Sequence, residues 1–400
     1  MKIALVSQEY PPETARGGIG SQTYSKAKGL SALGHEVYVI SRSIDRHRHQ
    51  QRVGNVNVIR IPGMDDSLPE MTTIVQWLTH SVVVAAEIGA LNKLVQLDII
   101  DFPEWAAEGY AYLLNRTAWN SVPVVIQLHG PLVMFAHAMG WPEIDSDFYR
   151  TGFQMEATAV QMADAIYSSS KCSAQWISSY YQPHAKNYPV IHVGVDTDLF
   201  IPKPYLKYET PTVIFIGKLV PNKGVTELVE ACLQLIKDIP GLRLRLIGNG
   251  ENSFIDTLKE KAIQAGAASM LDLPGFINKD DLPDELAKAH VFASPSWYEG
   301  GPGFVFLEAM ACGLPVIGCS GSGVDEIINH GYNGMLVPPK NAQALEDALR
   351  KILNDKELLE NLGVNARDYV LREADSRGCL KKLEDFYIKT VHGKSSGERN

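Results

Sequence analysis

The sequence predicts an α/β protein made of two domains, each built on a mostly parallel sheet. Its 400 residues exceed the roughly 100–200 typical of one domain. Short apolar runs alternate with amphipathic stretches along the chain, the pattern of parallel strands joined by helices. The pattern stops at residues 193–211, VGVDTDLFIPKPYLKYETP, where prolines and the lack of an apolar period predict a linker.

In the first half, each predicted strand is a short apolar run bounded by polar or turn residues. These strands are Ile3–Val6, Val37–Ile40, Val56–Ile61, Asp98–Asp101, Val124–Leu128, Ala165–Ser168 and Pro189–His192. Helical patterns lie between them, at Ser21–Leu33 and Glu70–Val95 for example.

A second series of the same kind follows the linker. Its predicted strands are Val213–Ile216, Leu244–Ile247, Met270–Leu273, His290–Ala293, Pro315–Gly318 and Met335–Val337. Two helical patterns complete the chain, within Glu357–Val391. Two Rossmann-like halves of comparable size result.

Composition and charge exclude several classes of protein. Hydrophobic residues at 45% and charged residues at 21% exclude disordered, collagen-like and coiled-coil chains. The net charge of -9 is spread along the chain, since residues 1–200 hold 14 Lys/Arg against 19 Asp/Glu. Neither half has the basic excess of a nucleic-acid-binding protein, so we expect no nucleic-acid partner.

Targeting signals and cysteine usage predict a cytoplasmic protein. The best candidate for a membrane span, Thr79–Val95, is interrupted by His80, Glu87, Asn92 and Lys93. The apolar start is too short for a signal-peptide core. Five scattered cysteines without a C-x-x-C pair predict reduced, buried thiols.

Ligands of open α/β sheets bind beyond the carboxyl ends of the strands, so the residues after each apolar run are the first candidates for a site. After the first strand, Gly17, Gly18 and Gly20 open a helix, where backbone N–H groups and the helix dipole favour an anion. A flexible turn is the alternative. The segment is no dinucleotide fingerprint because Thr23 replaces the third glycine, and the chain has no P-loop.

Two further strand ends carry basic side chains. The run Val124–Leu128 is followed by His129, whose imidazole could bond a substrate hydroxyl or transfer a proton, although a lone histidine is often structural. In the second half, Lys218 and Lys223 flank the start of a helix, which suits the charge of a diphosphate. A solvated turn is the alternative for the lysines.

Residues 294–317, SPSWYEGGPGFVFLEAMACGLPVI, form the most specific segment. Glu299 lies in a Gly/Pro loop, and Glu308 lies inside an apolar helical pattern. A carboxylate in such a pattern is costly to bury without partners, so Glu308 should meet hydrogen-bond donors such as ribose hydroxyls. A structural capping role is the alternative.

These motifs, in this order and spacing, make the chain resemble the retaining GT-B glycosyltransferases of the family 4 type. The resemblance runs over nearly the whole chain. Its motifs are Pro11-Pro12 to Gly17-Gly18-Ile19-Gly20, the His129 strand end, Gly194-Val195-Asp196 through Phe200 and Pro202, Gly217-Lys218 to Lys223-Gly224, Gly248-Asn249-Gly250, Pro274-Gly275-Phe276 and the glutamate segment.

The resemblance implies a GT-B fold, with two Rossmann-like domains facing each other across a cleft. Domain one would comprise residues 1–200 plus a returning helix at about 375–392, and domain two residues 201–374. Domain two would bind a nucleotide-sugar donor, and domain one the acceptor.

The resemblance also implies a role for each candidate. Four side chains would act in catalysis: His129, Glu299, Lys218 and Lys223. The donor's phosphates would contact Lys218 and Lys223, its ribose Glu308, and its base Ile277. The transferred sugar would contact Glu299, Gly303 and Phe304. The backbone N–H groups of Gly17 and Gly18 would also contact the donor.

Three departures from the family pattern stand out. The two glutamates lie nine residues apart, where the family has eight, which makes Glu299 the weaker assignment. Val193 replaces the asparagine usual before Gly194. Lys218 stands where arginine is frequent, which keeps the charge and loses the planar fork.

The implied reaction moves a hexosyl unit, with UDP-sugars the favoured donors, to an acceptor hydroxyl of a carbohydrate or lipid-linked substrate. Cations would stabilise the leaving diphosphate, and that phosphate would take the acceptor's proton on the same face of the sugar. No cofactor or metal is expected. The strings Asp145-Ser146-Asp147 and Asp196-Thr197-Asp198 are read as chance matches to a metal motif. The alternatives are another GT-B enzyme, such as an epimerase or phosphorylase, and a catalytically silent nucleotide- or carbohydrate-binding protein.

Two segments of the first half are candidates for the acceptor side. The basic stretch Arg42–Arg52 could meet an anionic acceptor or the inner face of a membrane, with a solvated loop as the alternative. Residues 101–105, DFPEW, could bind sugar by hydrogen bonds and stacking, with core packing as the alternative.

Overall fold

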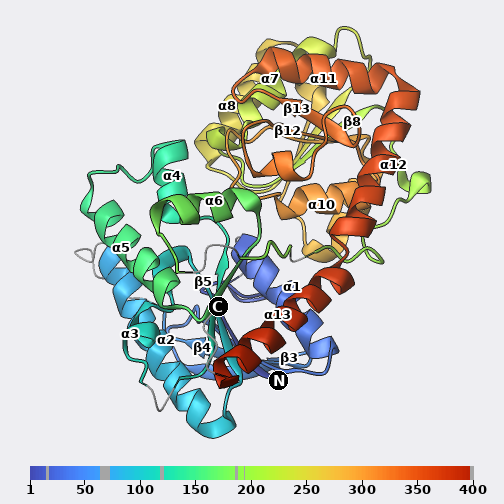
Figure 1. The fold of residues 1–400 in the computed structure, drawn as a ribbon. Coiled ribbons are helices and arrows are strands. Elements are labelled where there is room, and N and C mark those ends of the chain that lie inside the picture. The colour runs from blue at the N-terminus through green and yellow to red at the C-terminus, as the bar shows by residue number, and fades with distance from the viewer. Residues whose placement is uncertain (15–17, 64–72, 118–120, 185–187, 193, 397–400) are drawn as a thin grey trace. The chain divides into compact units, whose positions relative to one another are not determined.

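The computed structural model describes residues 1–14, 18–63, 73–117, 121–184, 188–192 and 194–396. The chain divides into two compact units (Figure 1). Unit 1 comprises Met1–Val193 with Arg377–Asn400, and unit 2 comprises Gly194–Ser376. The units are thus divided after Val193 and after Ser376, where the sequence-based expectation was after residues 200 and 374.

Unit 1 contains a seven-stranded sheet in the order β3-β4-β2-β1-β5-β6-β7. All neighbours are parallel except β3, which is antiparallel to β4. Central strands of a parallel sheet are covered on both faces, which explains their continuous apolar runs. The strands are β1 Lys2–Val6, β2 Glu36–Arg42, β3 His49–Val53, β4 Val56–Ile61, β5 Ile99–Pro103, β6 Val124–Leu128 and β7 Ala165–Ser168.

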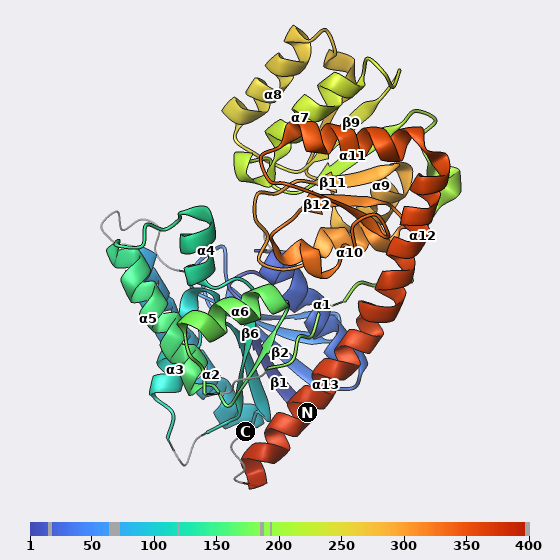
Figure 2. The ribbon, with the colours of Figure 1, turned by 45° about the horizontal axis from the view of Figure 1, so that its top comes forward.

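Helices cover both faces of this sheet. They are α1 Gly18–Ala32, α2 Thr73–Val95, η1 Trp105–Ala107, α3 Tyr110–Leu114, α4 Leu132–Met139, α5 Asp147–Met162, α6 Lys171–Tyr180 and α13 Ser376–Ser396. One core includes Leu30 of α1 and Leu383 of α13, and the other includes Ile88 of α2 and Val160 of α5. The returning helix α13 lies beside α1 so closely that a Cβ at Gly29 would fall 2.2 Å from Leu380 (Figure 2).

A buried polar cluster joins α13 to the sheet of unit 1. Asp101 accepts hydrogen bonds from the Lys26 ammonium at 2.8 Å, from the Tyr167 hydroxyl at 2.9 Å and from the Tyr387 hydroxyl. Burial lowers the pKa of Lys26. Asp101 and Phe102 are both buried. For these two residues, the structure therefore agrees with core packing, which was the alternative to sugar binding.

Three features of the chain differ from the sequence-based predictions. Strand β3 lies within the basic stretch, where no strand was predicted. The predicted strand Pro189–His192 forms a single bridge, from Val190 to Ser168. The predicted linker packs into unit 2, because Val195 pairs with Asp375 and, like Phe200, lies in the core.

Helix α2 is the one helix in the described ranges that length and composition alone would allow to cross a membrane. Its inner face belongs to the core of unit 1 through Val84, Ile88 and Leu91. Its outer face exposes Val82 and Leu94.

Unit 2 contains a six-stranded parallel sheet in the order β10-β9-β8-β11-β12-β13. Helices α7, α8 and α11 pack on one face and α9 and α10 on the other, while α12 contributes Leu362 to the first core and Val370 to the second. Figure 1 shows these helices around the sheet. The strands are β8 Thr212–Ile216, β9 Arg243–Ile247, β10 Leu271–Gly275, β11 Val291–Ser294, β12 Val316–Cys319 and β13 Gly334–Val337. The helices are η2 Pro204–Leu206, η3 Pro221–Lys223, α7 Val225–Leu235, α8 Asn252–Gln264, η4 Ala268–Met270, η5 Lys279–Asp281, α9 Leu282–Lys288, α10 Phe304–Ala311, η6 Gly323–Glu326, α11 Ala342–Asn354 and α12 Lys356–Glu373.

Candidate active site

In unit 2, the loops after the neighbouring strands β8 and β11 lie against each other. Gly224 follows η3 with φ 69°, and a Cβ there would sit 2.0 Å from the Pro295 carbonyl oxygen. Only glycine permits both this backbone conformation and this approach. The Trp297 N–H donates to the Asn222 carbonyl at 2.9 Å, which fixes the two loops together.

This contact brings two of the predicted site residues into an ion pair. The Lys223 ammonium lies 2.6 Å from Glu299 Oε1, with both side chains partly exposed. The Glu299 carbonyl accepts a 2.7 Å hydrogen bond from the Gly323 N–H, so the backbone of the glutamate loop is held as well. Lys218, at the end of β8, is exposed. Two cations and a carboxylate therefore lie in loops beyond the carboxyl ends of β8 and β11.

Glu308 is a buried carboxylate in the middle of α10, with 4% of its surface exposed. Among the described residues, no N–H or O–H group donates to its side chain. Burial raises the pKa of Glu308 to about 7, and the Lys279 charge acts in the opposite direction. A carboxylate in a residue this buried, without a donor from the described residues, fits a ligand that brings hydroxyl groups.

Lys279 is a further candidate site residue, which the sequence analysis missed. Its ammonium lies 5.3 Å from the centre of the Phe304 ring, at the start of α10. The residue follows Ile277, which is partly buried just beyond β10. The sequence signal that could have indicated it is its position two residues after Ile277, which was predicted to contact the base. Its closeness to Phe304 became visible only in the fold.

Gly303 caps the start of α10 in a left-handed conformation, with φ 66°. A side chain there would be strained, and its Cβ would approach the Phe306 ring at 3.0 Å. Gly303 and Phe304, both predicted to contact the transferred sugar, thus lie at the N-terminus of a helix, where Gly303 provides no side-chain cap.

In unit 1, His129 directly follows β6 and is partly buried. Burial lowers its pKa to about 3, with the Lys26 charge adding to the effect. The imidazole is therefore neutral at physiological pH. Its Nδ1 is buried and has no hydrogen-bond partner in the described part of the chain. Gly18 is exposed at the first position of α1, whereas Gly17 lies outside the described residues.

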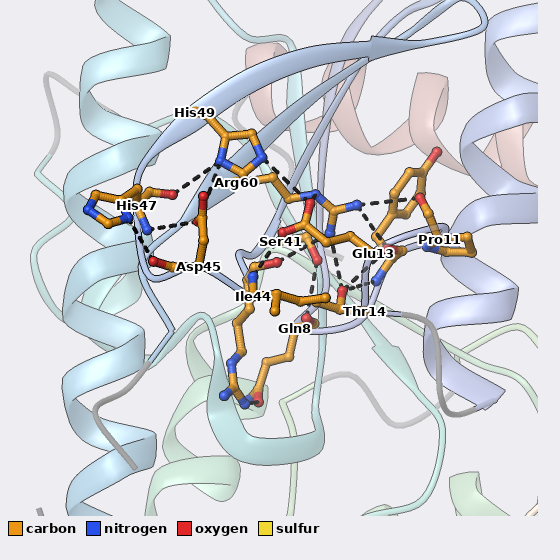
Figure 3. Close-up of polar contacts among 12 residues, drawn as sticks. Gln8, Pro11, Glu13, Thr14, Ser41, Ile44, Asp45, His47, His49 and Arg60 are labelled. Atoms are coloured by element: carbon orange, nitrogen blue, oxygen red, sulfur yellow. Dashed lines mark hydrogen bonds and ion pairs between the residues drawn. The ribbon is translucent and has the colours of Figure 1, made fainter. Parts of the chain in front are cut away.

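The loop between β1 and α1 is anchored by a buried arginine (Figure 3). The Arg60 guanidinium, fully buried on β4, donates to the Tyr10 carbonyl at 2.9 Å and to the Thr14 hydroxyl at 3.1 Å. It also lies 3.1 Å from Glu13, whose other oxygen accepts from the Ile44 N–H. The first part of the loop that leads to Gly18 is thus tied to β4 and to the segment after β2.

The basic stretch is less free than we expected. Arg48 donates two hydrogen bonds, at 2.9 and 2.7 Å, to the carboxylate of Glu87 on α2. His49 lies 3.5 Å from Glu13, while Arg46 and Arg52 are exposed. The charge of Arg48 is therefore already paired within unit 1.

The two D-x-D strings serve local structure. Ser146 caps α5, and Asp147 pairs with Arg150 at 2.8 Å. Asp196 accepts hydrogen bonds from the backbone N–H groups of the next turn. Within the described ranges, no group of three or more His, Cys, Asp or Glu side chains is arranged to hold a metal ion.

Comparison with known proteins identifies the family. Residues 16–199 match the family model described as Glycosyltransferase Family 4, and residues 197–369 match the model described as Glycosyl transferases group 1. The chain belongs to the GT-B glycosyltransferases of this family. Its two parallel-sheet units correspond to the two domains of that fold.

Relatives of this glycosyltransferase cover nearly its whole length. A GDP-mannose-dependent alpha-(1-6)-phosphatidylinositol monomannoside mannosyltransferase of Mycobacterium tuberculosis is 28% identical, over 96% of this chain and 97% of that one. The sucrose-phosphate synthase of Thermosynechococcus elongatus has a similar structure, with a TM-score of 0.84 at 21% identity, over 98% and 99% of the two chains. HepE of Anabaena in complex with UDP-glucose gives a TM-score of 0.75 at 19% identity, over 97% and 100%. At such identities the two structures show a shared fold.

Proposed function

We propose that this glycosyltransferase moves a hexosyl unit from a nucleoside-diphosphate sugar to an acceptor hydroxyl, with retention of the anomeric configuration. The observation that carries the proposal is Glu308, a buried residue whose carboxylate has no donor among the described residues. The hydroxyl groups of a ribose would supply those donors. Lys218 and Lys223, in the loop after β8, would neutralise the diphosphate that follows the ribose.

The ion pair between Lys223 and Glu299 supports separate roles for its two members. A bound diphosphate would compete for the ammonium and leave the carboxylate oxygens to accept hydrogen bonds from the sugar hydroxyls. As the bond between sugar and diphosphate breaks, negative charge grows on the leaving oxygen, and preplaced cations stabilise it without reorganisation. The leaving phosphate then takes the proton of the attacking hydroxyl.

For His129 we propose a role as a neutral hydrogen-bonding group. Its lowered pKa excludes a standing positive charge at neutral pH, so an imidazole nitrogen would donate to, or accept from, a hydroxyl of the transferred sugar. Gly303 and Phe304 would contact the same sugar through their backbone, and Ile277 the base. Gly17 and Gly18 would offer backbone N–H groups to the donor.

The donor proposed first is a UDP-sugar. GDP-mannose is the second candidate, because a full-length relative at 28% identity is named as GDP-mannose-dependent. Incubation with UDP-, GDP- and ADP-sugars and an acceptor panel, with detection of the released nucleotide and NMR of the product anomer, tests the proposal. Binding without turnover across the panel would favour the silent binding protein instead, and an inverted anomer would exclude retention.

We also propose a reaction that needs no metal, since lysines supply the positive charge at the site. Activity should survive excess EDTA, and its total loss, restored by added metal, would overturn this part of the proposal.

A lipid-linked acceptor at the inner face of a membrane remains our proposal for location and partner. The relative that is named for a phosphatidylinositol monomannoside supports it, as do the exposed Arg46 and Arg52. In a pelleting assay with anionic vesicles, changing both arginines to serine should reduce the bound fraction. Equal pelleting of the variant and the unchanged protein would reject the contact.

A further inference from the structure

The segment that carries His129 is held by two buried glutamates. Its available backbone donors are the N–H groups of His129, Gly130 and Leu132, because Pro131 has none. All three donate to the carboxylates of Glu104 and Glu156, both of which are fully buried.

Glu104 makes the direct contact with the histidine backbone. The His129 N–H lies 2.7 and 2.8 Å from its two oxygens, and the Gly130 N–H lies 2.5 Å from Oε1. From the other side, the Ser173 hydroxyl donates to the His129 carbonyl at 3.0 Å. The main chain of His129 is therefore fixed at both its donor and its acceptor.

Glu156, on α5, supports the next part of the same segment. It accepts from the Leu132 N–H at 2.9 Å and from the Tyr181 hydroxyl at 2.6 Å. Its second oxygen lies 3.3 Å from the N–H of Ala106, two residues after Glu104. The two carboxylates thus act on one segment and are linked to each other through the backbone.

The imidazole of His129 lacks the support that orients many functional histidines. Its buried Nδ1 has no partner in the described part of the chain, so no carboxylate or carbonyl fixes the ring through that atom. Among the described residues, the hydrogen bonds that fix His129 are those of its main chain. Two neighbouring residues, Ala106 and Ala107, adopt left-handed backbone with φ 61° and 47°, a conformation that is unfavourable for alanine. Strained backbone and two buried acidic side chains thus lie together where the segment is held.

We propose that Glu104, with Glu156 beside it, is the positioning residue for His129, and that both act through the backbone rather than by proton transfer to substrate. This inference rests on the function proposed above. It predicts that loosening the segment lowers the rate of the chemical step and leaves donor binding by unit 2 unchanged.

Glu104→Gln is the test variant. One side-chain oxygen would become an NH2 group about as near to the His129 N–H as the oxygen it replaces, so two donors would face each other and the segment would shift. We expect kcat to fall by about 10²-fold, the effect of a displacement near 1 Å, with the donor KM and nucleotide affinity unchanged.

Asp164→Asn is the matched control. The Asp164 carboxylate accepts a hydrogen bond from the Val124 N–H at 2.7 Å. It therefore binds the backbone at the start of β6, whereas Glu104 binds the backbone just after the end of the same strand. This variant should keep the wild-type kcat. Ser173→Ala removes the hydrogen bond to the His129 carbonyl and should lower kcat less than Glu104→Gln does. It is the second test variant, for use if Glu104→Gln does not fold.

Wild-type kcat in both folded Glu104→Gln and Ser173→Ala, or an equal fall in Asp164→Asn, would overturn the inference. Absence of sugar transfer by the unchanged enzyme, with every donor and acceptor, would instead reject the proposed function. The two failures are therefore distinguishable.

Discussion

Glu104 and Glu108 lie four residues apart after β5, and each binds the loop that follows a different neighbouring strand. Glu104 accepts from the backbone after β6, and Glu108 accepts from the Gln8 N–H after β1 at 3.2 Å. In the sheet, β5 lies between β1 and β6. One short segment therefore holds the loops on both sides of it, and these loops lead to His129 and to Gly18.

Replacement of Glu108 should lower the stability of unit 1. Its second oxygen lies 3.1 Å from Nε2 of His80, which is buried on α2. Glu108→Ala would leave the His80 ring without this partner, and a buried group left unpaired costs about 1–3 kcal/mol. Urea denaturation followed by circular dichroism measures the loss. Glu108→Gln, which can keep both contacts, should lose less, and equal losses would contradict this reading.

Lys223→Ala should impair sugar transfer far more than it impairs folding. Removing a group that stabilises developing charge lowers rates by about 10²–10³-fold, and we expect a fall of that size in kcat/KM for the donor. Steady-state kinetics with a saturating acceptor measures it. Lys237→Ala removes another unit 2 lysine, whose ammonium has a 3.4 Å contact with Gln234. Comparable kinetics of the two variants would exclude Lys223 from the site.

Glu308→Leu should stabilise unit 2 while abolishing nucleotide binding. The substitution removes a buried carboxylate that has no donor in the described part of the chain and keeps a similar volume, and such replacements are often neutral or stabilising. A gain of 1 kcal/mol would raise Tm by about 2–4 °C in a domain of this size. Thermal denaturation above pH 7, where the carboxylate is charged, measures the gain.

Glu285→Leu provides the contrast. Glu285 is also buried, but it pairs with Arg245 at 2.7 Å and with Lys288 at 2.8 Å, so its loss should lower Tm. A lower Tm in both variants would indicate that Glu308 has a structural role.

Stability should fall as the pH rises from about 5 to 8. Burial raises the pKa of Glu104 to about 7, and burial together with the nearby Glu104 raises that of Glu156 to about 8. Groups with raised pKa bind protons more tightly in the folded chain, so their contribution is complete below the unfolded value near 4.5 and is lost through pH 7–8.

Glu156→Gln tests the pH effect, because the neutral side chain does not titrate. The difference in Tm between the wild type and this variant should be larger at pH 5 than at pH 8. Glu143→Gln, at an exposed position, should follow the wild type at each pH. A constant difference for Glu156→Gln would mean that the buried acid does not titrate in this range.

The sequence predicted those parts of the fold that local pattern determines. Buried parallel strands such as β8 and β12 are short apolar runs, and their ends carry Lys218 and the glutamate loop. Strand β3, HQQRV, was missed because an edge strand with alternate exposed residues has no apolar run. Val190 lies in an apolar run but reaches only one bridge, since the sheet ends at β7.

The candidate site was predictable only residue by residue. Composition and order selected Lys223, Glu299 and Glu308, but neither shows that Lys223 and Glu299 pair or that Glu308 lacks a donor. Glu104 was predicted only as one of five possible sugar-binding residues, and Glu156 gave no signal. The backbone groups that these two side chains bind lie 25 and 24 residues away in the sequence. Contacts of that range depend on the register of the sheet and the packing of α5.

The most direct test of the account is calorimetric titration of the protein with UDP, GDP and ADP, repeated on Glu308→Leu and Lys223→Ala. We predict that one nucleotide binds at a single site, and that binding is lost in Glu308→Leu and strongly weakened in Lys223→Ala. The assignment of the donor site to the loops beyond the carboxyl ends of β8 and β11 would be contradicted by either of two results. One is wild-type affinity in both folded variants, and the other is no binding of any nucleotide to the unchanged protein.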